Sequence, residues 1–172
     1  MITIKRSSHG VFLGVMAALV WADIGAVAGQ RSGEKAADCG WRIELVRPRS
    51  GALLMRVPLD SDHPRFALSY THSVFHTPVK SRYRIIAGEI VQDTEVYSDP
   101  GYGMESSTDD PAQRLEKVDG HLRLTLERRI TNLVVRVQVT QNNRLIALEP
   151  VDLGQRFGNG AIALRPVWIC SQ

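Results

Sequence analysis

The stretch Asp119-Gly-His-Leu-Arg-Leu-Thr-Leu-Glu127, DGHLRLTLE, combines a tight turn with an alternating run of residues. Asp and Gly both tolerate the positive φ angles of a two-residue hairpin, so Asp119-Gly120 predicts a hairpin turn. From His121 onward polar and apolar residues alternate, and a period of two is typical of a strand with one buried face. The stretch therefore predicts one arm of an antiparallel hairpin.

The same alternation recurs on both sides of this hairpin. It is seen in Trp41–Leu45, Arg65–His72, Asn132–Thr140 and Gly160–Arg165. Turn signals separate these segments, and two of them, Ala87-Gly88 and Asn142-Asn143, consist of residues common in tight turns. Asn142-Asn143, like Asp119-Gly120, suits a hairpin. Because no long helical pattern intervenes, the sequence predicts an all-β fold, an antiparallel β-sandwich or barrel of about eight or nine strands.

The N-terminus has the three parts of a secretory signal peptide. Lys5 and Arg6 are positive, residues 11–22 are apolar, and Ala26-Val-Ala28 fits the A-x-A cleavage pattern. The apolar run is about a dozen residues long, whereas a helix that spans a bilayer needs roughly 20. We therefore predict an exported protein, most simply periplasmic, that does not span the membrane after cleavage.

This reading divides the chain into three parts. Residues 1–28 form the signal peptide, residues 29–38 are a polar, flexible lead-in, and residues 39–172 form a single all-β domain. The only two cysteines, Cys39 and Cys170, stand near the two ends of that domain. In an oxidising compartment an isolated pair is most simply a disulfide, so we predict that this bond joins the domain ends.

The charge distribution argues against nucleic acid as a partner. The formal net charge is +3, and the arginines are spread along the chain without a basic cluster. Nucleic-acid-binding domains usually show such a cluster together with a recognisable module. We interpret the arginines as residues on the polar faces of strands, with an anionic ligand or partner as the alternative.

The histidine-rich stretch that follows the second alternating segment is a candidate site. Alternation places His72 on the face of Phe66, Leu68 and Tyr70, which predicts a mostly buried and hydrogen-bonded ring. Ser73 would then point to the opposite face, so His72 cannot serve it as a base within a strand. The simplest interpretation of His72 is a histidine at the edge of the core.

A metal site is the alternative for the same region. If the chain bends before Thr77-Pro78, the rings of His72 and His76 could converge, with Glu105 as a third ligand. In a straight strand the two histidines would lie about 13 Å apart, too far to share a metal. This alternative corresponds to a metal-dependent or histidine-dependent hydrolase.

A long loop, residues 99–111, contains glycines, prolines and acids between two strand patterns. Long ordered loops on a rigid β scaffold often carry function. Gly101 and Gly103 lack a Cβ, which would let backbone amides approach a carboxylate or the His72 ring. The alternative is that these glycines only permit a tight turn.

Several of these motifs resemble the family called domain of unknown function 1850. They include His72-Ser-Val74, Thr77-Pro-Val79, Tyr83, Tyr102-Gly-Met-Glu105, Asp119-Gly120, Asn143-x-Leu145 and Asp152-Leu153. The resemblance runs from about Phe66 to Val167. This sequence departs from the commoner pattern at Phe75, where the family has Glu, and at Ser106, where it has Pro.

The resemblance implies a biological context. The family comprises small exported bacterial proteins, often encoded beside TAXI-type TRAP transporters. It therefore implies an accessory or binding module of organic-solute uptake. We expect no catalysis and no cofactor. The implied partners are the TAXI-type solute-binding protein or the TRAP membrane subunit. The candidate binding residues are His72, Ser73, Tyr83, Gly101, Gly103, Met104 and Glu105.

Overall fold

A computed structural model describes residues 39–98, 104 and 106–170 of the chain. These residues belong to the compact unit that spans Ala36–Gln172. The predicted signal peptide and lead-in, residues 1–38, lie outside the described residues, so both remain predictions. The described part contains no helix long and apolar enough to cross a membrane.

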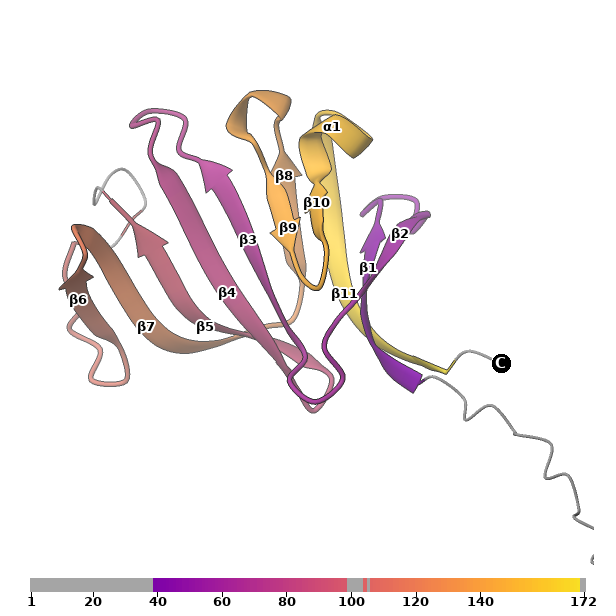
Figure 1. Ribbon diagram of the computed structural model, residues 1–172, viewed down its shortest axis with the longest axis horizontal. Coiled ribbons are helices and arrows are strands. Elements are labelled where there is room, and N and C mark those ends of the chain that lie inside the picture. The colour runs from indigo at the N-terminus through magenta and orange to yellow at the C-terminus, as the bar shows by residue number, and fades with distance from the viewer. Residues whose placement is uncertain (1–38, 99–103, 105, 171–172) are drawn as a thin grey trace, which may run out of the picture. The chain divides into compact units, whose positions relative to one another are not determined.

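Two antiparallel sheets make up the described fold (Figure 1). The four-stranded sheet has the order β2-β1-β11-β8, formed by β1 (Cys39–Val46), β2 (Leu53–Pro58), β8 (Leu133–Val137) and β11 (Gly160–Cys170). The seven-stranded sheet has the order β10-β9-β3-β4-β5-β7-β6. Its strands are β3 (Arg65–Thr71), β4 (Pro78–Ile86), β5 (Glu89–Tyr97), β6 (Arg114–Val118), β7 (His121–Ile130), β9 (Arg144–Ile146) and β10 (Pro150–Asp152). The predicted all-β sandwich is therefore confirmed, and among the described residues the sheets do not close into a barrel.

The described strands number eleven, more than the alternating pattern predicted. The difference comes largely from short strands, since β9 and β10 have three residues each. Three residues are too few to display a period of two. A 3-10 helix, η1 (Val139–Gln141), precedes β9, and a five-residue helix, α1 (Leu153–Phe157), follows β10.

The tight turns follow the residue types. Asp119 and Gly120 have φ angles of 51° and 81° and join β6 to β7, so the predicted hairpin is confirmed. Ala87 and Gly88 have φ angles of 50° and 83° and join β4 to β5 in the same way. Asn142-Asn143 is different, because it follows η1 on the connection between the two sheets.

The predicted hairpin at Asn142-Asn143 is therefore wrong. Asn142 does adopt a positive φ of 50°, but Asn143 is only 4% exposed. Its side-chain oxygen accepts a hydrogen bond from the Gln138 backbone N–H at 2.7 Å. Asn143 thus satisfies the backbone of a crossover between sheets, a role that local sequence does not distinguish from a hairpin.

Two apolar clusters fill the interior. The larger one lies between the sheets and includes Ile43, Leu45 and Ile162 of the small sheet with Phe66 and Leu68 of the large sheet. The smaller one consists of Val79, Tyr97, Leu124 and Leu126, with Tyr70, Met104, Leu115 and Leu122 packed against it. The large sheet therefore contributes to both clusters.

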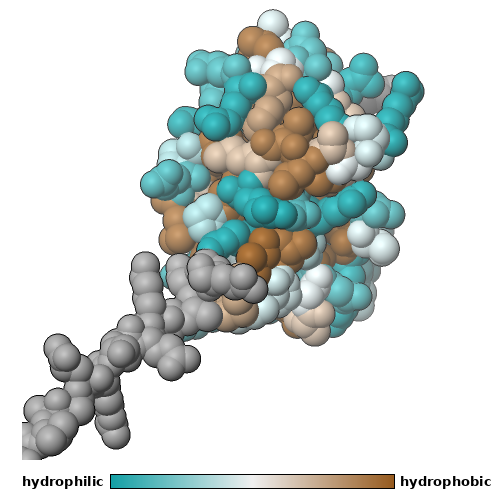
Figure 2. All heavy atoms as spheres, turned by 90° about the vertical axis from the view of Figure 1, so that its right-hand side faces the viewer, coloured by the Kyte–Doolittle hydropathy of each residue, from teal (hydrophilic) through white to brown (hydrophobic). Residues whose placement is uncertain are grey.

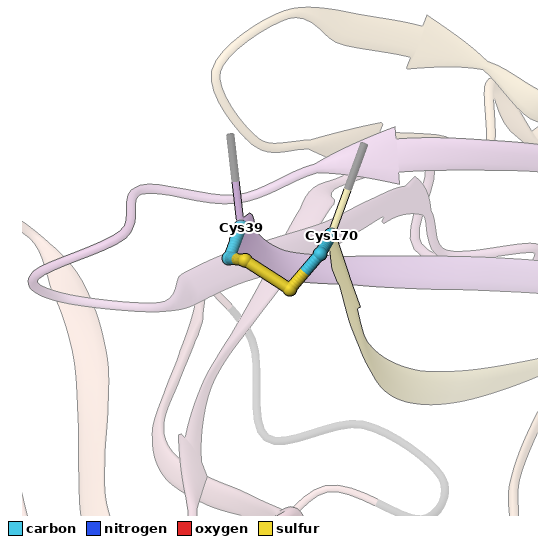
Figure 3. The surroundings of a disulfide bond; sticks show 2 residues. All are labelled: Cys39 and Cys170. Atoms are coloured by element: carbon cyan, nitrogen blue, oxygen red, sulfur yellow. A yellow bond between two sulfur atoms is a disulfide. The ribbon is translucent and has the colours of Figure 1, made fainter. Parts of the chain in front are cut away.

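The disulfide predicted from the two cysteines is present between Cys39 and Cys170 (Figure 3). The two residues face each other in the β1–β11 ladder, with Cα atoms 3.9 Å apart. Beside them Trp41 packs edge-on against Trp168, with ring centroids 5.5 Å apart. The first and last strands of the fold are thus joined by a ladder, an aromatic pair and a covalent bond.

The surface on the side of β1 and β2 is mixed in character. Figure 2 shows hydrophobic residues on this side interrupted by a band of hydrophilic ones. On β1 and β2, one contribution to the hydrophilic surface is the ion pair between Arg56 and Glu44 at 2.9 Å.

Candidate functional site

Two adjacent polar residues, Ser81 and Glu95, interrupt an apolar row on the inner face of the seven-stranded sheet. The register pairs Leu68 with Ser81, Ser81 with Glu95, and Glu95 with Leu124. Residues directly opposite each other on neighbouring strands point to the same face. Ser81 and Glu95 therefore stand in a row whose other members are leucines. The Ser81 hydroxyl donates to the Glu95 carboxylate at 3.0 Å.

A second row lies next to the first and is also polar at its centre. It runs from Phe66 to Tyr83, then to Gln92 and Arg128. We call Ser81, Tyr83, Gln92 and Glu95 together the polar seam. Ser81, Tyr83 and Gln92 are almost completely buried, whereas Glu95 is half-buried. The seam adjoins both apolar clusters, since Phe66 and Tyr83 belong to one and Leu124 to the other.

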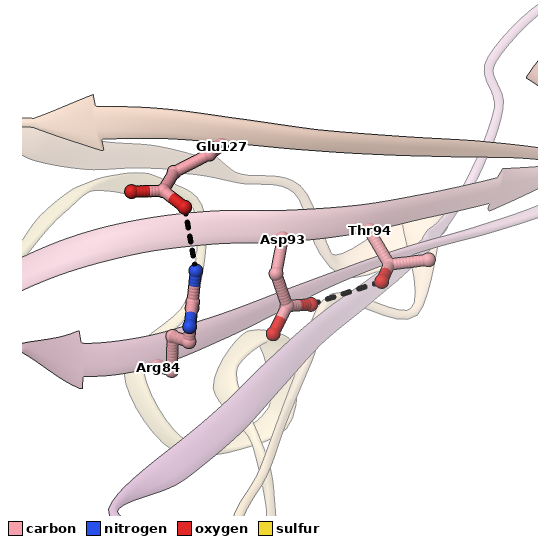
Figure 4. Close-up of polar contacts among 4 residues, drawn as sticks. All are labelled: Arg84, Asp93, Thr94 and Glu127. Atoms are coloured by element: carbon pink, nitrogen blue, oxygen red, sulfur yellow. Dashed lines mark hydrogen bonds and ion pairs between the residues drawn. The ribbon is translucent and has the colours of Figure 1, made fainter. Parts of the chain in front are cut away.

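A β-bulge accompanies the seam. The pairing shifts between Arg82 and Tyr83 on β4 and between Gln92 and Thr94 on β5, which leaves Asp93 as the extra residue. Beside the bulge, the Thr94 hydroxyl donates to Asp93 at 2.9 Å, and Arg84 of β4 reaches Glu127 of β7 at 2.9 Å (Figure 4). Bulges re-aim side chains and are frequent next to functional sites. Here the bulge sets the positions of Gln92 and Glu95 on the inner face.

The seam borders a cleft of about 290 Å³ between the two sheets. The large sheet contributes Tyr70, Ser81, Tyr83 and Glu95 to its lining. The opposite wall is Leu133–Arg136 of β8, the edge strand of the small sheet. Because β8 has no neighbour beyond it in the described sheet, the cleft lies along a sheet edge. We call this space the inter-sheet cleft.

The two tyrosines of the cleft keep their protons at neutral pH. Burial raises the pKa of Tyr83 to about 12, the nearby Glu95 charge adds to this rise, and the hydrogen bond with Ser81 opposes it. Burial likewise raises the pKa of Tyr70, with Glu95 again contributing. Both phenols therefore present O–H groups that can donate hydrogen bonds.

The cleft can accordingly bind a small polar molecule. The Glu95 carboxylate accepts hydrogen bonds and attracts a positive charge, and the phenols that line the same cleft offer donors. Aromatic rings next to a few convergent polar groups are typical of small-molecule sites. The lining also includes Arg136 and Arg144, so these functional groups best match a ligand with several hydroxyl groups or one that carries both an amine and an acidic group.

His72 lies outside the cleft, in the loop between β3 and β4. β3 ends at Thr71, one residue before His72, so His72 is not part of the strand face that alternation predicted. Its ring is half-buried instead of mostly buried. Its Nδ1 accepts the backbone N–H groups of Val74 and Phe75 at 3.2 and 3.3 Å. The ring is thus hydrogen-bonded, as predicted, and its partners are backbone groups of its own loop, which His72 caps.

Most of the rest of this loop is exposed, and only Thr77 is half-buried. The His72 N–H donates to the Thr77 carbonyl at 2.8 Å, and the His76 N–H donates to the His72 carbonyl at 2.9 Å. His76 has a positive φ of 54°, and both it and Ser73 are exposed. Phe75, which stands where the family pattern has Glu, packs its ring 5.1 Å from the His72 ring.

The predicted site residues are only partly brought together. Tyr83 lines the inter-sheet cleft, whereas His72 and Ser73 lie in the loop beyond β3. Met104 packs against the smaller apolar cluster, as Tyr70 does. Gly101, Gly103 and Glu105 fall outside the described residues, so the proposed loop site and the metal alternative stay predictions. Among residues 39–98, 104 and 106–170, no group of three or more metal-ligating side chains occurs.

Sequence reasoning missed Ser81, Gln92 and Glu95. A signal for them exists in the sequence, because Ser81 interrupts the inward series Val79, Tyr83 and Ile85. On β5 the bulge breaks the alternation between Gln92 and Glu95, so the two do not appear to share a face. A strand pattern with polar residues at inward positions is the general sign of such a seam.

Comparison with known proteins identifies one matching family. Residues 66–150 match the family described as Domain of unknown function (DUF1850). The match begins in β3 and ends at the first residue of β10, so it contains the whole polar seam. No curated protein and no solved structure matches the chain.

Proposed function

Because the chain carries the domain of the DUF1850 family, we propose that it is an exported binding module that acts beside a TAXI-type TRAP transporter of organic solutes, without catalysis. The observation that carries the binding role is the inter-sheet cleft, where Tyr70 and Tyr83 share the lining with the half-buried carboxylate of Glu95, to which Ser81 donates. Its ligand is a small polar molecule with several hydroxyl groups or with both an amine and an acidic group.

Export is supported by two independent features. The first is the signal-peptide pattern of residues 1–28. The second is the Cys39–Cys170 disulfide, since such bonds persist mainly in oxidising compartments. A periplasmic location would place the cleft in contact with solutes before they cross the inner membrane.

Calorimetric titration tests the binding role of the cleft. We expect a probe from a panel of ethanolamine, glycine and glycerol to bind the exported protein. Glu95→Gln keeps an oxygen for Ser81 but removes the charge, and should weaken binding of an amine probe by about tenfold. Glu89→Gln on the same strand is the matched control, because Glu89 is exposed and lies outside the cleft lining. Equal binding by all three proteins would contradict the role of the cleft.

Two further measurements test the context and the absence of catalysis. Affinity isolation of the periplasmic protein should recover a TAXI-type solute-binding protein or the TRAP membrane subunit, and its recovery from neither would count against the transporter association. Elemental analysis of purified protein should find no stoichiometric transition metal. Stoichiometric zinc that is lost in His72→Ala would favour a metal-dependent hydrolase built on His72, His76 and Glu105.

A further inference from the structure

A second hollow lies on the other side of β8, over the outer face of the four-stranded sheet. It has a volume of about 900 Å³ and runs between the β1–β2 turn and the strands β8 and β11. Three arginines line it, Arg47, Arg49 and Arg136, together with Val134 and Ala161. We call this hollow the arginine groove.

The register shows how the groove is built. β11 lies between β1 and β8 in the sheet, and Ala161 of β11 faces Arg136 of β8. Arg47 and Arg49 follow the end of β1, so they stand on the opposite side of β11 from Arg136. Two strand spacings separate β1 from β8, which amounts to about 10 Å. The groove therefore has a guanidinium on each wall, with the small side chain of Ala161 between them and Val134 beside Arg136 on β8.

Arg47 is held in place by the chain around α1. Its guanidinium donates to the Phe157 carbonyl at 3.3 Å. A Cβ on residue 160 would lie 3.0 Å from the Arg47 Nη1, so Gly160 leaves room for this guanidinium. One contact of this kind leaves further N–H donors of the guanidinium for a ligand. A side chain fixed in advance loses little freedom when it binds.

Asn159 adds an oriented donor to the same groove. Its side-chain oxygen accepts the Val139 backbone N–H at 2.8 Å. Because the oxygen is used in this way, the amide NH₂ points away from Val139. Asn159 lines the groove with Thr140 and Gln138, whose side chains also offer donors.

The charge of the groove is uncompensated within the described part of the chain. Some arginines elsewhere on the surface pair with acids, as in Arg56–Glu44, Arg84–Glu127 and Arg114–Glu116. No acidic residue is among those that line the groove, and no described acid forms an ion pair with any of its three arginines. Like charges gathered without partners repel each other, and an anion relieves that repulsion.

We propose that the arginine groove binds a small organic dicarboxylate. Guanidinium groups match the planar, bidentate geometry of carboxylates. One carboxylate pairs with Arg47 and Arg49, the other pairs with Arg136, and the methylene chain lies on Val134 and Ala161. Arg47, Arg49, Asn159 and Gly160 lie outside residues 66–150, so most of this site is separate from the part of the chain that matches the family. Arg136 also borders the inter-sheet cleft, but Arg47, Arg49 and Asn159 lie outside that cleft.

Calorimetric titration of the exported protein with succinate and adipate tests this site at low ionic strength. Arg49→Gln and Arg136→Gln should each weaken dicarboxylate binding by about tenfold, because each removes one charged wall. Arg114→Gln is the control: it makes the same change of net charge, and Arg114 is a highly exposed residue of β6 outside the groove. Circular dichroism of each variant checks that the fold is retained.

Three outcomes would overturn the proposal. The first is that neither dicarboxylate binds the wild-type protein. The second is that Arg114→Gln weakens binding as much as the groove variants do, which would indicate a general charge effect. The third is that inorganic pyrophosphate or poly-glutamate binds through Arg49 and Arg136 while the dicarboxylates do not. Glu95→Gln should leave dicarboxylate affinity unchanged or raise it slightly, so a failure of the cleft proposal is distinguishable from a failure of this one.

Discussion

At the scale of single residues, His72 shows how a side chain can replace a backbone acceptor. Its Nδ1 accepts two backbone N–H groups of its own loop, from Val74 and Phe75. Since Nδ1 accepts, the neutral ring carries its proton on Nε2. Asn and Asp side chains form the same kind of local bond in turns. His72 is therefore a structural residue of the β3–β4 loop.

A pair of substitutions at His72 separates the acceptor from the ring. His72→Ala removes the acceptor for two N–H groups and should lower the free energy of unfolding by roughly 0.5–1.5 kcal/mol. His72→Asn places an oxygen where Nδ1 stands and should recover most of this loss. Urea denaturation measures both values. If Asn is as destabilising as Ala, packing of the ring against Phe75 matters more than the hydrogen bonds.

Tyr83 should make stability depend on alkaline pH. Its folded pKa of about 12 lies above the ordinary value of 10.0. Between these two values the unfolded chain loses the proton first, so the unfolded state binds fewer protons and stability falls as pH rises. The stabilisation is complete below about pH 10, and roughly 2–3 kcal/mol of it is lost by about pH 12.

Tyr83→Phe provides the comparison, because it removes the titrating group and keeps the ring. Unfolding free energies of both proteins should be measured from about pH 9 to about pH 12. We expect the wild-type curve to fall more steeply than that of Tyr83→Phe in this window. Parallel curves would show that Tyr83 is solvated in the folded protein.

The residues of the cleft were harder to predict than those of the loop. His72 was a candidate because histidines often act as bases or metal ligands. Ser81 and Glu95, by contrast, resemble ordinary polar residues in a strand. Their importance comes from the register, which places them opposite each other and between leucines. Register is a tertiary property, and a one-residue bulge at Asp93 is enough to conceal it from a period-two pattern.

At the scale of elements, the β4–β5 hairpin holds Ala87 in a backbone conformation that alanine rarely adopts. Ala87 has a φ of 50° at an exposed turn position. The left-handed region costs roughly 1–2 kcal/mol for most residues and less for Asn or Gly. The neighbouring β6–β7 hairpin has Asp119 at the equivalent position, with a φ of 51°.

Ala87→Asn should therefore stabilise the protein. We expect a gain of roughly 0.5–1 kcal/mol in the free energy of unfolding, because Asn tolerates the left-handed conformation. Ala112→Asn is a suitable control, since Ala112 is also exposed but does not have a positive φ. Chemical denaturation would show the difference, and equal effects at both positions would contradict the explanation.

Strands were predicted well where they are long, and turns were predicted well where they depend only on their own residue types. Residues 121–127 alternate clearly and fall within β7, and the Asp119-Gly120 turn needs no information beyond its own residue types. Arg65–His72 was correct except at its end, where His72 leaves the strand to close the loop. β9 and β10 depend on pairing with β3 and with each other, so three residues alone do not reveal them.

At the scale of the whole molecule, the disulfide is the largest single constraint. Cys39 and Cys170 are separated by 131 residues in the sequence. Closing so long a loop restricts the unfolded chain far more than the folded one, in which the β1–β11 ladder already holds the ends together. The sequence predicted this pairing because no other cysteine is present.

Removal of the disulfide should consequently destabilise the protein strongly. The double variant Cys39→Ala, Cys170→Ala should lose roughly 2–5 kcal/mol of unfolding free energy. A reducing agent should produce a similar loss in the wild-type protein and no loss in the double variant. Comparison of urea denaturation with and without dithiothreitol measures all four values. An unchanged wild-type curve under complete reduction would contradict this prediction.

The position of the disulfide also decides how the fold responds to mechanical tension. A force that pulls on residues 39 and 170 meets a covalent bond before it meets any hydrogen bond of the sheets, because these residues pair directly at the end of β1 and β11. In the oxidised protein, stretching from these two points extends the chain by almost nothing, and the sheets between them carry no load. After reduction, the same force would act on the β1–β11 ladder one pair at a time, starting at its open end, and would unzip it.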